Sequence, residues 1–145
     1  TMKSLLDVLS DKDRLCLVRF DDRAERMTPL LRVSKENFEV FKSNISLLQD
    51  RGGTNIANGM DMAFRVLRER KYSNPVSGIF LLTDGLDGGA HQRVSACMVE
   101  RKLLEDNFTI NCFGFGRDHD EDLLNNISKL KDGNFYFIDK LDTVD

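Results

Sequence analysis

Apolar side chains recur every third or fourth residue in five segments of the chain, and this spacing places them on one face of an α-helix. The clearest segment has apolar residues at positions 38, 41, 45 and 48 and follows Ser34, a residue type that commonly caps helix N-termini. The last segment ends near Gly133, which is expected to close it because glycine favours the position after a helix. Helices are predicted around residues 2–9, 35–48, 56–67, 94–104 and 123–130.

Runs of consecutive apolar residues predict strands that are buried inside a sheet. One such run is 15–20, apolar at five of six positions; the polar residues Asp21-Asp22-Arg23 turn the chain into a second predicted strand at 24–33, and the pair predicts an antiparallel hairpin. Pro29 lies in the second strand and has no N–H for a strand ladder, so this strand is expected at a sheet edge. Further strands are predicted at 79–82, 108–116 and 135–138.

Strands and helices alternate in the second half of the chain, which favours a parallel sheet covered by helices. The predicted fold class is therefore α/β: a Rossmann-like, doubly wound, mostly parallel sheet with one antiparallel edge strand and helices on both faces. A length of 145 residues suits one domain and is short for two. We therefore expect a single domain over residues 1–145.

Two polar residues are candidates for chemistry, because ligands of such sheets bind outside the carboxyl ends of the strands. Asp84 follows the buried run at 79–82, and Thr54 lies in the glycine-containing stretch before the helix at 56–67. Carboxylate and hydroxyl oxygens are ligands for Mg²⁺, Ca²⁺ or Mn²⁺. Each residue also has a purely structural interpretation, since Thr54 or Asn55 could cap the helix and Asp84 could open a turn.

Charge and composition narrow the classes of partner. The net charge is −3 and the sequence pI is about 5.4, so nothing favours nucleic acid or an anionic membrane. No apolar stretch approaches the roughly 20 residues that span a bilayer. The three cysteines show no Cys-x-x-Cys spacing, which argues against a zinc site or a disulfide framework. Buried thiols in a reducing, cytoplasmic compartment are expected instead.

Signatures of catalysis are missing from the sequence. There is no Gly-x-Ser-x-Gly motif and no Walker loop, and Gly114 and Gly116 lack the third glycine of a dinucleotide-binding turn. The acidic residues from Asp118 to Asp122 do not have EF-hand spacing and suit the N-terminus of a helix. The protein is therefore not expected to be an enzyme.

Five stretches together resemble the von Willebrand factor type A domain, and they occur in the order that this family has. The resemblance implies an interaction domain with a metal-ion-dependent adhesion site, in which Thr54 corresponds to the threonine ligand and Asp84 to the aspartate ligand. It further implies Mg²⁺, Ca²⁺ or Mn²⁺ as the cation and a partner's Glu or Asp carboxylate as the group that completes its coordination. The stretches are "DRLCLVRFDD" (13–22), "RGGTNIANGMDMAF" (51–64), "GIFLLTDGLD" (78–87), "TINCFGFGRDHD" (109–120) and "GNFYFI" (133–138).

One part of the family pattern, the Asp-x-Ser-x-Ser loop, is not in the sequence. We interpret the opening "TMKSLLDVLSD" as the end of the helix that follows that loop, so the family's first central strand is expected to be absent from this chain. Cation binding should then be weak or absent. The resemblance leaves open a metal-independent scaffold domain of a larger intracellular protein, copine-like or associated with a ubiquitin ligase, and a hydrolase or transferase on the same fold.

Overall fold

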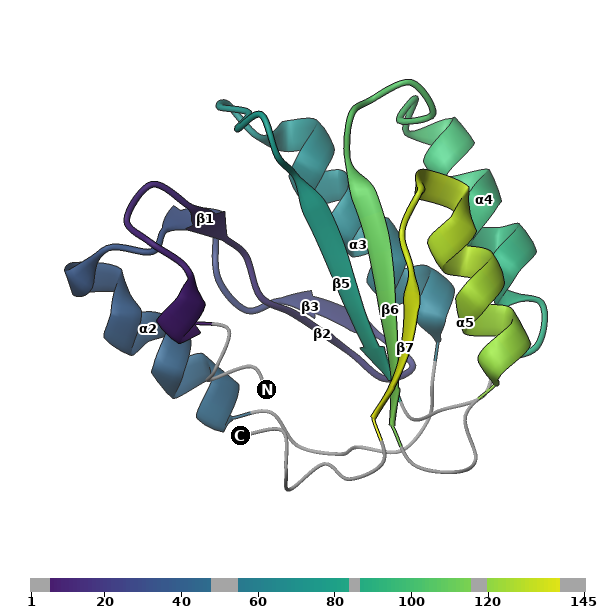
Figure 1. Ribbon diagram of the computed structural model, residues 1–145, viewed down its shortest axis with the longest axis horizontal. Coiled ribbons are helices and arrows are strands. Elements are labelled where there is room, and N and C mark those ends of the chain that lie inside the picture. Colours follow the sequence, from purple (N-terminus) through teal and green to yellow (C-terminus); the bar gives the residue numbers. More distant parts are fainter. Residues whose placement is uncertain (1–5, 48–54, 84–86, 116–119, 139–145) are drawn as a thin grey trace.

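The computed structural model describes residues 6–47, 55–83, 87–115 and 120–138. Its centre is a parallel sheet with the strand order β5-β6-β7, as the alternating pattern predicts. The three strands are β5 (Gly78–Thr83), β6 (Thr109–Phe115) and β7 (Phe135–Ile138). The helices α3 (Ile56–Glu69), α4 (Ala90–Glu100) and α5 (Glu121–Ser128) lie along one face of this sheet (Figure 1).

The main hydrophobic core lies between that face and the three helices. In β5, Ile79 and Leu81 are buried while Phe80, between them, is half exposed, which is the two-residue alternation of a strand with one covered face. In β6, Ile110 and Cys112 are fully buried on the same side. The helices contribute, among others, Ile56, Met60, Phe64, Val94, Met98, Leu124 and Ile127.

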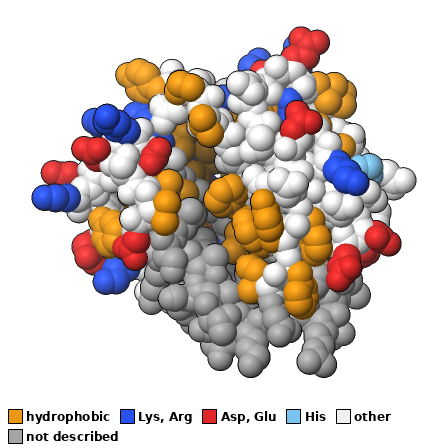
Figure 2. Space-filling model, in the orientation of Figure 1, with side chains coloured by type: hydrophobic (Ala, Val, Ile, Leu, Met, Phe, Trp, Pro, Cys, Tyr) orange, Lys and Arg blue, Asp and Glu red, His pale blue; other side chains and the backbone are white. Residues whose placement is uncertain are grey.

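Aromatic side chains occupy the opposite face of the sheet. The Phe113 ring packs edge-on against Phe80, with centroids 5.7 Å apart, and stacks on Tyr136 at 5.2 Å. Phe80 and Tyr136 are 49% and 47% exposed, and hydrophobic side chains gather on the side of the molecule seen in Figure 2. Within the described residues, the helices that pack on this sheet therefore lie on one face only.

The predicted hairpin is antiparallel, but each predicted strand divides into two. The strands β1 (Arg14–Leu15) and β4 (Leu31–Arg32) pair, and so do β2 (Val18–Phe20) and β3 (Ala24–Arg26). The interruption is at Leu17, whose N–H donates to the Thr28 hydroxyl at 3.1 Å and whose carbonyl accepts from Met27 N–H at 2.8 Å. The prediction of Pro29 within an edge strand is wrong, because Pro29 lies between β3 and β4.

A second, smaller core joins this hairpin to α2 (Lys35–Ser46). As predicted, Ser34 caps α2, and its hydroxyl accepts the Asn37 N–H at 3.3 Å. Phe41 and Ile45 are buried on the inner side of the helix. They pack with Leu6, Leu17 and Val33.

Two predicted helix ends are wrong in detail. The helix α4 ends at Glu100, so Leu104 lies beyond it and is largely exposed; Lys102, with φ of 60°, has left the helical conformation. After α5, a short 3₁₀ turn, η1 (Lys129–Lys131), is ended by Asp132 with φ of 52°. Asp132 therefore takes the left-handed conformation that was expected of Gly133.

Candidate functional site

Both predicted metal ligands, Thr54 and Asp84, lie outside the residues that the structure describes. Their nearest described neighbours are Asn55, Thr83 and Asp87. Thr83 is the last residue of β5 and is buried. The geometry of the candidate site is therefore developed from the first turn of α3, the end of β5 and the start of α4.

The first turn of α3 is held by the turn between β2 and β3. The Asn55 N–H donates to the Asp21 carbonyl at 2.7 Å, and the Asn58 side-chain amide donates to the Asp22 carbonyl at 3.0 Å. Asn55 is also the N-cap of α3, since its side-chain oxygen accepts the Asn58 N–H at 3.0 Å. Of the two residues considered for this cap, Asn55 carries it.

The same turn of α3 is held from the other side by the segment after β5. Asp87 accepts the Ile56 N–H through Oδ2 at 2.9 Å, and its other carboxylate oxygen forms an ion pair with Arg93 of α4. The Asp87 carbonyl accepts the Ala90 N–H at 3.1 Å. Gly89, which lies between these residues, has φ of 80°, a conformation that favours glycine. The loop therefore turns sharply into α4 with Asp87 facing α3.

Asp87 was not recognised from the sequence. The available signal is the second aspartate of "TDGLDGG" (83–89), which precedes two glycines and a helix. A carboxylate near a helix N-terminus is favoured by the helix dipole, but the helix that Asp87 contacts is α3, which begins far from it in the sequence. Local pattern reasoning cannot find a partner that lies 31 residues away in the sequence.

The fit of these residues to a divalent cation depends on the donor set. Within the described ranges, no group of three or more His, Cys, Asp or Glu side chains could hold a metal. The carboxylate of Asp87 is already occupied by the Ile56 N–H and by Arg93, so it is not a free ligand. The predicted donors, the Thr54 hydroxyl and the Asp84 carboxylate, lie outside the described residues; hydroxyl and carboxylate oxygens are of the kind that Mg²⁺ accepts together with several waters.

The other residues singled out in the sequence have structural roles where they are described. Asp120 caps α5 by accepting the Leu123 N–H at 3.0 Å, and Glu121 and Asp122 lie in its first turn, as the dipole interpretation predicts; Asp118 lies outside the described residues. All three cysteines are free thiols. Burial raises the pKa of the Cys112 thiol to about 12, which disfavours the reactive thiolate form near neutral pH.

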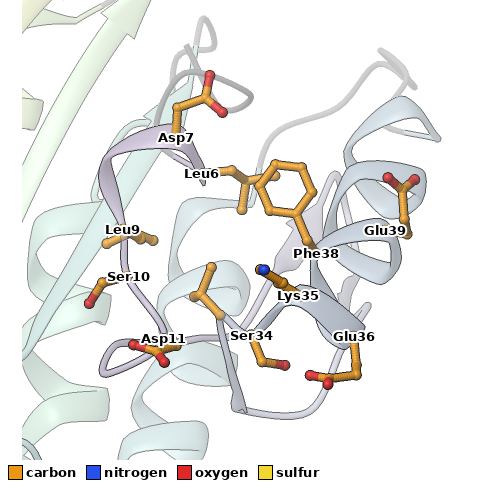
Figure 3. A pocket seen from close by; sticks show the side chains of 11 residues that line it. Leu6, Asp7, Leu9, Ser10, Asp11, Ser34, Lys35, Glu36, Phe38 and Glu39 are labelled. Carbon is orange, nitrogen blue, oxygen red and sulfur yellow. The ribbon is translucent and has the colours of Figure 1, made fainter.

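A groove lies elsewhere, between residues 6–11 and the start of α2 (Figure 3). Its volume is about 680 Å³, and Leu6 and Phe38 point toward one another across it. Acidic side chains and one lysine line its rim, and Glu36 among them has a lowered pKa because its carboxylate accepts from its own N–H and from the Ser34 hydroxyl. The lining residues are Leu6, Asp7, Leu9, Ser10, Asp11, Val33, Ser34, Lys35, Glu36, Phe38 and Glu39.

Comparison with known proteins places the chain in a family. The family model for the von Willebrand factor type A domain matches residues 1–145, so the chain belongs to the von Willebrand factor type A family, as the resemblance indicated. Members of this family generally mediate protein interactions, and some carry a metal-ion-dependent adhesion site. Within the described residues, no helix is long and apolar enough to cross a membrane.

Related proteins are much longer than this chain. It is 30% identical over 136 residues to the uncharacterized protein sll0103 of Synechocystis sp., covering 93% of the chain and 31% of that protein. It is 35% identical over 122 residues to the inter-alpha-trypsin inhibitor heavy chain H4 of Homo sapiens, covering 79% and 13%. With the probable E3 ubiquitin-protein ligase WAVH2 of Arabidopsis thaliana the identity is 30% over 94 residues, covering 59% and 13%.

Solved structures share the fold. The von Willebrand factor type A structure from Catenulispora acidiphila has a TM-score of 0.84 and 24% identity, covering 98% of this chain and 33% of that one. Proximal thread matrix protein 1 from the mussel byssus, solved with a zinc-occupied adhesion-site motif, has a TM-score of 0.68 and 22% identity, covering 99% and 36%. At these identities the likeness describes the fold alone.

Proposed function

We propose that this chain is a protein-interaction module that binds a Glu or Asp carboxylate of a partner through a divalent cation held by Thr54 and Asp84. One observation carries the proposal: the Ile56 N–H and the Asp87 carboxylate are hydrogen-bonded at 2.9 Å. Ile56 is two residues after Thr54, and Asp87 is three residues after Asp84. Because a residue spans at most about 3.6 Å of chain, Thr54 and Asp84 are each within a few residues' length of this hydrogen bond, which supports assigning them to one site.

The chemistry of the two side chains suits the cation. A threonine hydroxyl and an aspartate carboxylate are hard oxygen donors, and Mg²⁺ is commonly bound through one or two carboxylates with waters in its other positions. The bound cation would supply a positive charge that a partner's carboxylate can approach directly. Ca²⁺ and Mn²⁺ accept the same donors. With two ligands from the chain, the affinity is expected to be weak.

A metal-independent scaffold is the second candidate function, and the hydrogen bonds that hold the first turn of α3 favour it. The first turn of α3 is fixed by Asp21, Asp22 and Asp87 through hydrogen bonds that need no cation. On this interpretation, the loops bind a partner directly. In either case, the free cysteines suit a reducing compartment, and we infer a module of a larger intracellular protein, such as one associated with a ubiquitin ligase.

Isothermal titration calorimetry with Mg²⁺ tests the cation. The wild-type chain should show saturable binding, and Thr54→Ala and Asp84→Ala should each weaken it at least tenfold. The Asp7→Ala variant is the matched control, because it removes an exposed carboxylate at the groove and should leave the affinity unchanged. Absence of Mg²⁺-dependent heat from the wild type would contradict the metal-dependent function.

A second titration tests the acidic partner. A short peptide with one glutamate should bind only when Mg²⁺ is present, and the same peptide with glutamine should not bind. Equal binding of the glutamate peptide with EDTA and with Mg²⁺ would favour the metal-independent scaffold. Turnover of phosphate or acyl ester substrates by the wild-type chain, lost in Asp84→Ala, would instead favour an enzyme.

A further inference from the structure

The groove between residues 6–11 and the start of α2 (Figure 3) has the size and the lining of a binding site. Its volume of about 680 Å³ lies within the roughly 300–1,000 Å³ of ligand pockets. Leu6 and Val33 are buried, whereas Leu9 and Phe38 are partly exposed and pack against the smaller core. An occupant of the groove can therefore reach apolar side chains on both of its walls.

Hydrogen bonds hold the two walls of the groove together. The Val33 N–H donates to the Asp13 carbonyl at 2.9 Å, and the Arg32 Nε donates to the Asp11 carbonyl at 3.2 Å. The Ser10 N–H donates to the Asp13 carboxylate at 2.9 Å, which closes the turn after the first wall. The groove is thus formed without a partner, and a preorganised surface loses less conformational freedom on binding.

The rim of the groove is acidic. Each wall contributes two carboxylates at exposed positions, whereas Lys35 carries the one positive charge among the residues that line the groove. The ion pairs among the described residues involve none of these carboxylates. A negative rim around apolar side chains is complementary to a partner that surrounds an apolar residue with positive charges. The four carboxylates belong to Asp7, Asp11, Glu36 and Glu39.

We propose that the groove binds a basic, amphipathic helix of a partner protein, with an apolar side chain between Leu9 and Phe38 and lysines or arginines beside the carboxylates. An apolar centre with a polar rim is the usual composition of a protein interface. Helices that bind in grooves present apolar residues at every third or fourth position. This partner is opposite in charge to the acidic partner of the cation site, and its binding needs no cation.

Fluorescence anisotropy with a labelled peptide tests the proposal. The probe is a helical peptide of about 14 residues with leucine at every third or fourth position and lysine between the leucines. One comparison peptide has glutamate in place of lysine, and another has alanine in place of leucine. The wild-type chain should bind the probe with a Kd below about 1 mM, equally in Mg²⁺ and in EDTA, and each comparison peptide at least about tenfold more weakly. No binding of the probe, or equal binding of either comparison peptide, overturns the proposal.

Charge substitutions in the protein locate the binding site. The double variant Glu36→Gln, Glu39→Gln should weaken probe binding about fivefold, whereas Lys35→Gln removes the opposing charge and should strengthen it about twofold. The matched control is Glu100→Gln with Glu105→Gln, which changes the net charge equally at exposed positions outside the groove. This control should change the affinity by less than about twofold. Equal weakening by the two double variants would show nonspecific attraction to an acidic protein and would overturn the proposal.

A truncation tests the apolar contact. Phe38→Ala should weaken probe binding about tenfold, whereas Val40→Ala, exposed on the same helix and outside the groove lining, should leave it within about twofold. Far-UV circular dichroism shows whether the variants fold, and Leu9→Ala replaces Phe38→Ala, with the same expectation, if the latter does not. Equal binding by the apolar variant and the wild type would contradict the assignment. A dimer of the free chain in sedimentation equilibrium, lost in the same variant, would assign the groove to a second copy and overturn the proposal.

Discussion

Gly133 lies against the backbone of the neighbouring strand, and replacing it by alanine gives a sharp test of the sheet packing. A Cβ at Gly133 would overlap the carbonyl carbon and oxygen of Ile110, far inside the 3.0 Å that real Cβ atoms keep, and would lie 3.2 Å from the Asn111 N. Ile110 is fully buried in β6 and pairs with β5, so its carbonyl cannot move aside without disturbing the sheet. The Gly133 N–H is itself bonded to the Ser128 carbonyl at 3.0 Å, which restrains the glycine as well.

The expected magnitude follows from what has to move. Inserting a methyl group into a well-packed core costs about 1–3 kcal/mol, and occasionally more. Because the obstruction at Gly133 is the backbone of Ile110 and Asn111 rather than a side chain that can rotate, we expect Gly133→Ala to lower the free energy of unfolding by about 3 kcal/mol or more. Against a typical total of roughly 5–15 kcal/mol, this loss is large enough to shift the urea midpoint clearly.

Two other glycines provide a graded control for the same substitution. A Cβ at Gly59, inside α3, would lie 2.7 Å from two ring carbons of Phe20, a side chain that can rotate. The roughly 1 kcal/mol that alanine gains over glycine in a helix offsets part of that clash, so the net loss should stay below about 2 kcal/mol. A Cβ at Gly88 would meet nothing within 4 Å, and Gly88→Ala should change stability by less than about 0.5 kcal/mol.

Urea unfolding followed by far-UV circular dichroism measures the series, since the chain has no tryptophan. The loss of stability should fall in the order Gly133→Ala, Gly59→Ala, Gly88→Ala. A Gly133→Ala protein that unfolds within about 0.5 kcal/mol of the wild type would refute the close approach of this glycine to β6. A loss at Gly88 equal to that at Gly133 would refute the steric explanation altogether.

Two further predictions concern the cores. Phe41, fully buried in the smaller core, should cost about 3–5 kcal/mol when replaced by alanine, whereas Val40→Ala, at an exposed position of the same helix, should cost less than about 0.5 kcal/mol in the same urea assay. Burial raises the pKa of Cys112 from 9.0 to about 12, so its thiol should resist Ellman's reagent at pH 8 until urea is added. The pKa of Cys112 is higher in the folded state, so the unfolded state ionises first as the pH rises. The stability that comes from keeping this thiol neutral is therefore complete below pH 9 and declines by up to about 1.4 kcal/mol per pH unit between pH 9 and 12. Cys112→Ala should remove most of this pH dependence, and an unchanged slope would contradict the assignment.

The parallel sheet could be predicted because its signals are local. The continuous apolar runs of β5 and β6 are what a strand inside a sheet needs, and helical spacing is strong on either side of each run. The cap of α2 by Ser34 was predictable for the same reason, since the hydroxyl and the N–H that it accepts are three residues apart. The fold class and the start of α2 follow from interactions within one turn or one strand.

Two of the errors have a common cause in contacts between residues that are distant in the sequence. The division of the predicted strands at Leu17 depends on a bond to Thr28, 11 residues away. Gly133 was interpreted as a helix-ending residue, yet its place is set by the close approach to Ile110 across the sheet. In both cases a residue type has several local uses, and the fold selects one that the local sequence does not specify.

The same reasoning explains why the candidate site could be predicted only in part. Thr54 and Asp84 were predicted because each follows a recognisable local pattern, a glycine-containing turn before a helix and the end of a buried run, and they stay predictions because both lie outside the described residues. Asp87 was not found, because its role depends on the start of a helix 31 residues earlier. The first turn of α3 depends on both kinds of contact: Ile56 and Met60 are buried in the core, while the Asp21 carbonyl and the Asp87 carboxylate accept the N–H groups of Asn55 and Ile56. The start of α3 is therefore fixed by contacts with the core and with two segments distant in the sequence, and a local sequence pattern does not reveal the distant ones.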